Sequence, residues 1–176
     1  MGVLQELDYE VKPANAIQRA MQRVASTRAA AWVFQRTLYP IDRLLFRWTN
    51  GRFTVPGLVA GLPIIMLTTT GRKSGEPRTM PLVGVPIGDD VAVIGTNCGQ
   101  QHAPGWVYNP EADPTATVAH RDRTVSVIAR PADDAESDRA FEQAGAVYPG
   151  YLEYRDRVTH RDIRVFVLET APTGAG

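Results

Sequence analysis

Between residues 62 and 170 the chain alternates short apolar or threonine-rich stretches with turn-forming segments, and this alternation constrains its fold more than any other feature. Apolar and β-branched residues suit the pleated surface of a sheet, whereas glycine, asparagine and aspartate suit the turns between strands. The pattern predicts six strands, at Ile64–Thr70, Met80–Ile87, Val91–Asn97, Thr115–Ala119, Thr124–Ala129 and Ile163–Glu169. Because few long crossovers separate them, we expect a mostly antiparallel sheet that curls into a barrel.

Three segments outside the strands indicate helices that flank the sheet. A short helix is predicted over Gly105–Glu111. An acidic stretch that opens at Asp133 suits the start of a helix reaching about Val147, because the helix dipole favours negative charge there. One or two further helical turns are expected over Tyr148–Arg157. The expected fold class is therefore α+β, mostly β with flanking helices.

The first 60 residues differ from the rest and predict an N-terminal basic helical arm, with the barrel domain at 61–176. Apolar residues recur at helical spacing over 14–36, and a shorter apolar helix is expected over 41–49. Residues 14–52 hold seven arginines and a single acid. Such a local charge attracts anions, a lipid headgroup surface or nucleic acid. The alternative is that the arm caps the barrel or forms an interface between copies of the chain.

The composition limits the remaining classes of protein. A chain of 176 residues, 44% apolar and 22% charged, is expected to form one globular domain with a core. A single cysteine, Cys98, excludes a disulfide framework, and the three histidines lack partners at metal-ligand spacing. The net charge of zero argues against general nucleic-acid binding. The longest apolar runs are too short to span a bilayer and Met1–Glu10 does not resemble a signal peptide, so we expect a cytoplasmic protein.

A loop rich in cations joins the first two predicted strands. Arg72, Lys73 and Arg78 lie within seven residues, in a segment with two glycines and a proline. Arginine offers a planar fork to phosphate or carboxylate, lysine offers a point charge, and glycines let backbone N–H groups approach an anion. The loop therefore predicts an anion cradle; the alternative is a solvated hairpin tip. The spacing does not match a phosphate-binding P-loop or a nucleophile elbow.

Two aromatic groups are further candidates. Tyr148, Tyr151 and Tyr154 recur every three residues, which in a helix makes a wall suited to a flat conjugated substrate, or else a filled core. Trp106 and Tyr108 lie in the predicted short helix, whose first N–H groups are free to meet an anion or a carbonyl. Trp106 taken alone is more typical of a core residue.

These pieces occur in the order and spacing of a known family. The segments are IMLTTTGRKSGEPR at 65–78, VAVIGTNCG at 91–99, PGWVYNPEADP at 104–114 and VYPGYLEY at 147–154. Together they resemble the deazaflavin-dependent nitroreductase family, which includes coenzyme F420-dependent quinone and nitro reductases. The resemblance covers about residues 62–170. It implies a split β-barrel related to the barrels that bind flavin mononucleotide (FMN), and it implies use of the reduced deazaflavin coenzyme F420.

The resemblance also implies roles for individual residues. The coenzyme's phosphate and carboxylate tail would be held by Arg72, Lys73, Ser74 and Arg78. Its ring and ribityl chain would be lined, largely by backbone groups, by Ile94, Gly95, Thr96, Asn97, Gly105, Trp106, Val107, Tyr108 and Asn109. The electron-acceptor pocket would be formed by Tyr148, Tyr151 and Tyr154. Two positions depart from the family's pattern: Cys98 replaces a glycine, and Val83 stands where some relatives have a tyrosine facing the acceptor.

The expected function is transfer of hydride from reduced F420 to a quinone, a nitroaromatic or an activated alkene. A deazaflavin carries the electrons, so the protein supplies position and electrostatics and needs no nucleophile. The alternatives are an FMN-dependent reductase of the same barrel type and a non-catalytic carrier of a coenzyme or lipid. The expected partners are a small-molecule acceptor, a second copy of the chain, and the inner face of the cell membrane through the basic arm.

Overall fold

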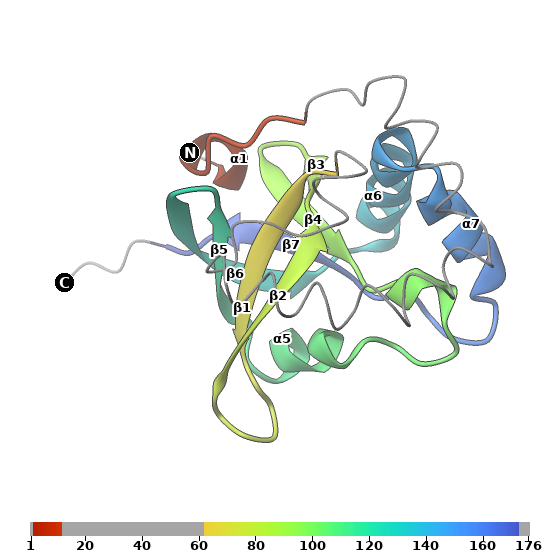
Figure 1. Ribbon diagram of the computed structural model, residues 1–176, viewed down its shortest axis with the longest axis horizontal. Coiled ribbons are helices and arrows are strands. Elements are labelled where there is room, and N and C mark those ends of the chain that lie inside the picture. The colour runs from red at the N-terminus through yellow and green to blue at the C-terminus, as the bar shows by residue number, and fades with distance from the viewer. Residues whose placement is uncertain (1, 12–61, 173–176) are drawn as a thin grey trace.

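The computed structural model describes residues 2–11 and 62–172, which fold around a single seven-stranded sheet (Figure 1). The strands are β1 Ile64–Thr70, β2 Pro77–Val83, β3 Val85–Ile87, β4 Asp90–Ile94, β5 Thr115–His120, β6 Arg123–Pro131 and β7 Val165–Thr170. Their order across the sheet is β2-β1-β5-β6-β7-β4-β3, and every neighbouring pair is antiparallel. The predicted antiparallel sheet is confirmed.

The sheet curls and carries helices on its outside. Strand β2, at one end of the order, contacts β4 near the other end, so the sheet closes into a half-barrel. The helices are α1 Val3–Glu6, α5 Tyr108–Ala112, α6 Asp134–Val147 and α7 Gly150–Arg157, with short 3-10 turns η1 Asn97–Gly99 and η2 Gly105–Val107. Helices α6 and α7 lie together beside β3 and β4, and α5 lies near the β1–β2 hairpin (Figure 1). This confirms the predicted class, a split β-barrel with flanking helices.

One predicted strand is wrong in its extent. The stretch Met80–Ile87 forms two strands, β2 and β3, which lie at opposite edges of the sheet. The chain changes direction at Gly84, whose N–H donates to the carbonyl of Pro63 at 3.0 Å. A Cβ at Gly84 would lie 2.6 Å from the hydroxyl oxygen of Tyr9, so only glycine fits there. The break between the two strands depends on Tyr9, which lies 75 positions from Gly84 in the sequence. No pattern in the residues around Gly84 therefore predicts it.

The acidic stretch after β6 starts a helix as predicted. Asp133 is the N-cap of α6 and accepts from the N–H of Glu136 at 2.8 Å, while the Glu136 carboxylate accepts from the N–H of Asp133 at 2.9 Å. This reciprocal capping box satisfies two N–H groups that an uncapped helix leaves open. Arg130 of β6 pairs with the same carboxylate at 2.6 Å and with Glu169 of β7 at 2.7 Å. The start of α6 is thereby fastened to the sheet.

The N-terminal segment 2–11 is part of the core. Val3, Leu7 and Tyr9 are buried in one cluster with Ile65 and Phe166 of the sheet. The Tyr9 hydroxyl donates to the carbonyls of Gly84 at 2.6 Å and Pro63 at 2.9 Å. The predicted arm helices at 14–36 and 41–49, and the expected boundary near residue 61, lie outside the described residues. Within the described residues no helix is both long and apolar enough to cross a membrane.

Candidate functional site

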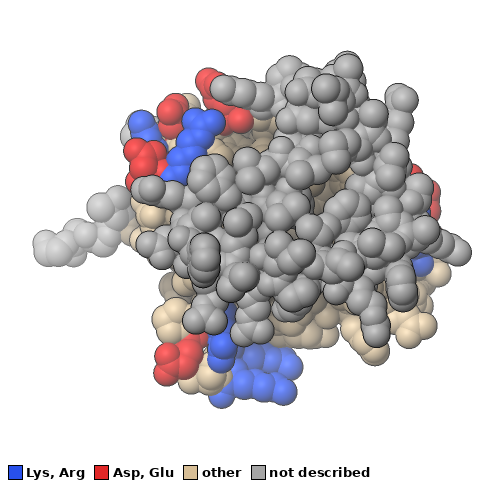
Figure 2. Space-filling model, in the orientation of Figure 1, with Lys and Arg blue, Asp and Glu red and all other residues tan. Residues whose placement is uncertain are grey.

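The cation loop forms the tip of the β1–β2 hairpin. The strands pair up to Thr70 and Pro77, and the N–H of Gly71 donates across the loop to the carbonyl of Glu76 at 2.8 Å. Gly75 has a φ of +67°, a conformation that glycine adopts without strain. The three predicted anion-binding cations are exposed, namely Arg72, Lys73 and Arg78. In Figure 2 basic side chains gather at the lower edge of the molecule, where this hairpin lies.

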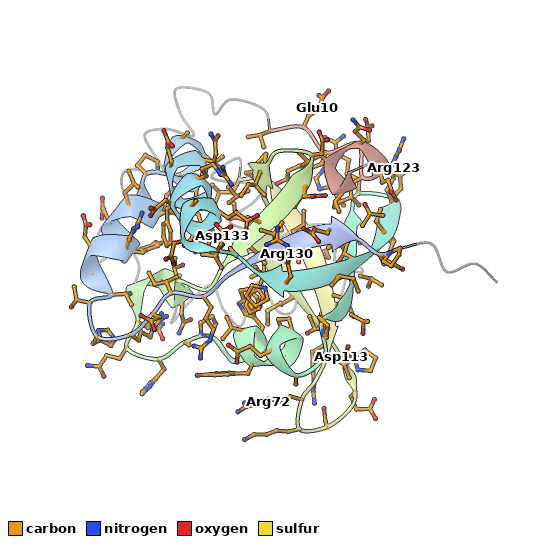
Figure 3. The ribbon with its side chains drawn as sticks, turned by 180° about the vertical axis from the view of Figure 1, so that it is seen from behind. Glu10, Arg72, Asp113, Arg123, Arg130 and Asp133 are labelled. Atoms are coloured by element: carbon orange, nitrogen blue, oxygen red, sulfur yellow. The ribbon has the colours of Figure 1, made fainter. Side chains whose placement is uncertain are left out.

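Two residues of α5 hold the base of this loop. The buried amide of Asn109 accepts from the N–H of Arg72 at 3.2 Å and donates to the Thr69 hydroxyl at 3.0 Å. The ring of Tyr108 has the Arg72 guanidinium 4.5 Å from its centroid and that of Arg164 at 5.1 Å. Figure 3 shows Arg72 beside α5, well away from Arg130 at the start of α6. The structure thus brings together Arg72, Tyr108 and Asn109, which the sequence analysis assigned to one coenzyme.

The cations of the loop form no ion pair with the described residues, and the loop holds one acid, Glu76, against three cations. Among residues 2–11 and 62–172, no carboxylate pairs with Arg72, Lys73 or Arg78. Arg78 donates to the Ser74 hydroxyl at 3.2 Å, which turns both side chains toward one side of the loop. A Cβ at Gly71 would lie 2.8 Å from that same hydroxyl oxygen and 3.0 Å from the carbonyl oxygen of Glu76, so a larger residue would crowd the turn. Within the described residues, these three exposed cations have no acid partner, which keeps the predicted anion cradle a candidate site.

The segment after β4 packs against η2. Ile94 and Thr96 are buried, and the N–H of Gly95 donates to the carbonyl of Arg164 at 2.8 Å. A Cβ at Gly95 would lie 2.7 Å from a methyl of Val107, so the two backbone segments can approach only because residue 95 is glycine. The predicted ring-binding stretches 94–97 and 105–109 are therefore neighbours in space.

The side chains of Trp106 and Val107 do not face a ligand. Both are buried in the main core, and the Trp106 ring lies 5.8 Å from that of Phe166. Of the two interpretations of Trp106, core packing is the one the structure supports. A contact of these residues with a coenzyme would have to come from their backbone.

Three consecutive residues after Thr96 adopt left-handed backbone conformations. The φ angles are +49° at Asn97, +53° at Cys98 and +76° at Gly99. Asparagine and glycine tolerate this region, whereas cysteine is strained in it. The Asn97 amide supports the turn by donating to the carbonyl of His102 at 2.9 Å. Cys98, which departs from the family's glycine, thus occupies a position whose geometry favours glycine.

The three predicted tyrosines form a compact cluster. Tyr148 follows α6, and Tyr151 and Tyr154 lie in α7; the ring centroids are 6.1–6.2 Å apart in every pair. Each side chain is no more than 7% exposed. The hydroxyls of Tyr148 and Tyr154 are 3.4 Å apart. Burial, foremost, raises the pKa of all three phenols, so they keep their protons at neutral pH.

The tyrosine cluster and the cation loop are joined by one stretch of chain. Helix α7 packs against η1 at residues 97–99, and α5 packs against β1 beside the loop. The segment Ile94–Ala112 runs between these two contacts and carries the residues predicted to bind the ring. The loop predicted to hold the coenzyme tail therefore lies at one end of this segment, and the tyrosines predicted to hold the acceptor lie near its other end. The residues predicted to line the coenzyme ring lie on the segment itself.

Comparison with known proteins identifies the family. The family model described as F420H(2)-dependent quinone reductase matches residues 42–170. The chain belongs to this family. A quinone reductase of this kind from Mycobacterium tuberculosis is 32% identical over 98 residues, which are 54% of this chain and 64% of that protein. The chain thus matches just under two thirds of the length of this curated relative.

Solved structures agree with the family assignment. A structure described as an F420-H2-dependent reductase (FDR-A) shares 35% identity and a TM-score of 0.56, covering 61% of this chain and 94% of that one. A structure described as a domain-swapped dimer shares 31% identity and a TM-score of 0.58, covering 80% and 99%. The family resemblance drawn from the four sequence segments is confirmed.

Sequence reasoning missed several residues that shape this family member's site. Thr69 supports Asn109 from the end of β1, and Arg164 stacks on Tyr108 while pairing with Glu111. Arg161 contacts the loop that follows β4. Arg161 and Arg164 lie in the segment before β7, far along the chain from their partners, so no local motif marks them. The run of three threonines before the cation loop was the one available signal for Thr69.

Proposed function

We propose that this chain transfers hydride from reduced coenzyme F420 to a quinone. The observation that carries the proposal is the exposed cation loop, whose cations form no ion pair within the described residues and which is fastened to α5 through Arg72, in a chain of the F420H(2)-dependent quinone reductase family. An anionic tail is the ligand that such a loop suits. Lys73 would provide a point charge, and Arg72 and Arg78 would provide planar forks to phosphate or carboxylate.

The residues assigned to the coenzyme ring fit a flat group. Gly105 is exposed, and a Cβ built there would meet no atom of residues 2–11 or 62–172 within 4 Å, so these residues leave space beside η2. The preceding stretch Ile94–Thr96 is buried, and Ile94 and Gly95 bond to the segment that leads into β7, which suits a surface that must hold a ring in one orientation. Backbone groups of these segments, more than their side chains, would contact the ring.

The tyrosine cluster fits a conjugated acceptor. Its rings pack in one buried cluster with Phe141 and Val165, and its hydroxyls stay protonated because burial keeps the phenol pKa high. A phenol can donate a hydrogen bond to an acceptor oxygen as negative charge develops on it, which stabilises the transition state. When bound, the reduced coenzyme supplies a hydride, and with one proton this converts the quinone to a hydroquinone. Tyr148, Tyr151 and Tyr154 would orient the acceptor and shield it from water.

Fluorescence of the oxidised coenzyme tests the proposal directly. Purified protein, reduced F420 and menadione should regenerate the fluorescent oxidised form at a rate proportional to protein concentration. Recovery no faster than in a protein-free control, across quinones, nitroaromatics and activated alkenes, would overturn the assignment. Tight coenzyme binding without turnover would select the carrier alternative. A yellow protein that releases flavin on denaturation would select the FMN alternative.

Two features of location and assembly complete the proposal. We propose that the enzyme is cytoplasmic and meets quinone at the inner face of the membrane through the arginine-rich residues 14–52. Sedimentation with anionic vesicles tests this contact. The protein should sediment with the vesicles, and a variant in which the arginines of residues 12–61 are replaced by glutamine should not.

A homo-oligomer is also expected, and the relative described as a domain-swapped dimer is consistent with it. Light scattering coupled to gel filtration measures the mass; a monomer at all concentrations would contradict it.

A further inference from the structure

Arg161 is a half-buried arginine that contacts the strained loop after β4. Its guanidinium donates to three backbone carbonyls of that loop: Thr96 at 2.9 Å, Gly95 at 3.3 Å and Gln100 at 3.4 Å. A fourth carbonyl, that of Asp162 at 3.3 Å, fixes the side chain to its own segment. A planar group with five N–H donors is the one side chain able to gather so many carbonyls at once.

The loop it holds needs external support. Left-handed backbone is strained at residues that bear a Cβ, and it persists only where surrounding contacts over-determine it. Cys98 is such a residue, and it sits between Asn97 and Gly99 in the same region. Besides Arg161, the Asn97 amide binds the carbonyl of His102, and a ring nitrogen of His160 lies 3.0 Å from the carbonyl of Gln101. The connector from α7 to β7 therefore holds the loop from one side.

The loop lies between the two halves of the candidate site. Its first residues, 95–97, are among those assigned to the coenzyme ring. A Cβ at its last left-handed residue, Gly99, would lie 3.4 Å from the ring of Tyr154, so the loop also touches the tyrosine cluster. A shift of this loop would change the distance between ring and acceptor. Hydride transfer is sensitive to such a shift because the reacting atoms must meet at near contact.

We propose that Arg161 is a positioning residue that sets the shape of the 95–100 loop and thereby the placement of the coenzyme ring relative to the tyrosine cluster. The inference rests on the proposed function and goes beyond it, because Arg161 is not among the predicted site residues and contacts two of them, Gly95 and Thr96, only at their backbone carbonyls. Its role is exerted through the carbonyls of Gly95, Thr96 and Gln100.

Three variants test the role, with Arg139→Gln as the control. Arg139 is an exposed arginine on α6, away from the loop. Arg161→Gln should lower kcat for menadione at least tenfold while changing its KM less than threefold, and Arg139→Gln should change neither. Arg161→Lys should restore only part of the rate, because an ammonium cannot reach all three carbonyls. A lysine variant equal to wild type would show that charge alone matters and would overturn the proposal.

Chemical rescue separates positioning from general stability. In Arg161→Ala, millimolar guanidinium chloride should recover part of kcat, whereas sodium chloride at equal ionic strength should not. Without any coenzyme, amide hydrogen exchange over residues 95–102 should be faster in Arg161→Gln than in wild type, with β1 and β5 unchanged. Unchanged exchange in the loop, or equal recovery with both salts, would overturn the proposal. If wild-type protein itself fails to bind F420, the proposed function fails, while the exchange result still decides the role of Arg161 in the loop.

Discussion

Cys98 illustrates how a single backbone angle limits the choice of residue. At φ +53° a side chain costs about 1–2 kcal/mol, whereas glycine loses about 0.5–1 kcal/mol more chain entropy than other residues on folding. Cys98→Gly should therefore raise the free energy of unfolding by about 0.5–1 kcal/mol. Cys98→Ala keeps the strain and serves as the matched control. Denaturant titration measures the free energy of unfolding of both variants. An equal increase in Cys98→Gly and Cys98→Ala would show that the backbone at this position is not strained.

Lys73 allows a test of the cation loop that is separate from folding. Its side chain is exposed on the hairpin tip, so Lys73→Ala should leave the denaturation midpoint unchanged. Loss of one charge-assisted contact should weaken coenzyme binding by on the order of 1.5–3 kcal/mol. Fluorescence titration with oxidised F420 measures the affinity, with Arg139→Ala on α6 as a control that should bind normally. An unaltered titration for the Lys73 variant would remove the loop from the coenzyme site.

The substitution Tyr151→Phe tests the acceptor pocket, because it removes only the phenol oxygen. Tyr151→Phe keeps the ring and its packing against Tyr148 and Tyr154, whose centroids lie 6.1 and 6.2 Å away. We expect turnover with menadione to fall several-fold, since a hydrogen-bond donor to the acceptor is lost. Coenzyme affinity should not change. Equal kcat and KM in wild type and variant would mean that this phenol only fills the core.

At the scale of the element, the start of α6 links helix capping to pH. The hydrogen bond and ion pair from Arg130, with the N–H of Asp133, lower the pKa of Glu136 from 4.5 to about 2. Because the folded-state pKa is depressed, the stabilisation is complete above about pH 4.5. It is lost as the pH falls from there toward 2.

Glu136→Gln removes this contribution. At neutral pH we expect a loss of about 1–2 kcal/mol, discounted because Arg130 is 38% exposed. Between pH 4.5 and 2 the variant should lose less stability than wild type does. Thermal unfolding across this range measures the difference, and Glu142→Gln, an exposed position on the same helix, should follow wild type. Parallel pH curves for wild type and Glu136→Gln would contradict the assignment.

Over the whole molecule, the N-terminal segment closes the half-barrel. Tyr9 connects it to the break between β2 and β3 through the carbonyl of Gly84, and to the residue before β1 through the carbonyl of Pro63. Its ring also meets His120 of β5 edge to face, with centroids 4.8 Å apart. Residues 2–11 therefore hold together parts of the sheet that are distant in strand order.

Tyr9→Phe tests this closure. The buried carbonyl of Gly84 loses its bond to this hydroxyl, while the carbonyl of Pro63 keeps the N–H of Gly84, and the loss should lower the free energy of unfolding by about 1–3 kcal/mol. Coenzyme affinity should be unaffected, because the segment is distant from the cation loop. The exposed neighbour Glu10 supplies the control Glu10→Gln, which should unfold as wild type does. A Tyr9→Phe variant as stable as wild type would mean that the hydroxyl bonds do not hold the sheet closed.

Local patterns predicted most of the elements and the candidate site. Alternating apolar residues marked the strands because a strand exposes one face and buries the other. The acidic start of α6 was readable because capping joins residues only three apart, Asp133 and Glu136. The cation loop was readable because its charges and glycines are adjacent in sequence. The resemblance of four short segments to one family then placed these pieces in a common site.

Only the tertiary structure decided the contacts between residues far apart in the chain. The break at Gly84 depends on Tyr9, and the loop at 95–100 depends on Arg161, which is 65 positions from Thr96. Such pairs arise when separate elements pack together, and packing leaves no periodicity in the sequence around either partner. Short-range hydrogen bonding and hydrophobic alternation therefore specify the strands and helices, whereas side-chain packing between distant segments specifies where the strands break and how the site is held.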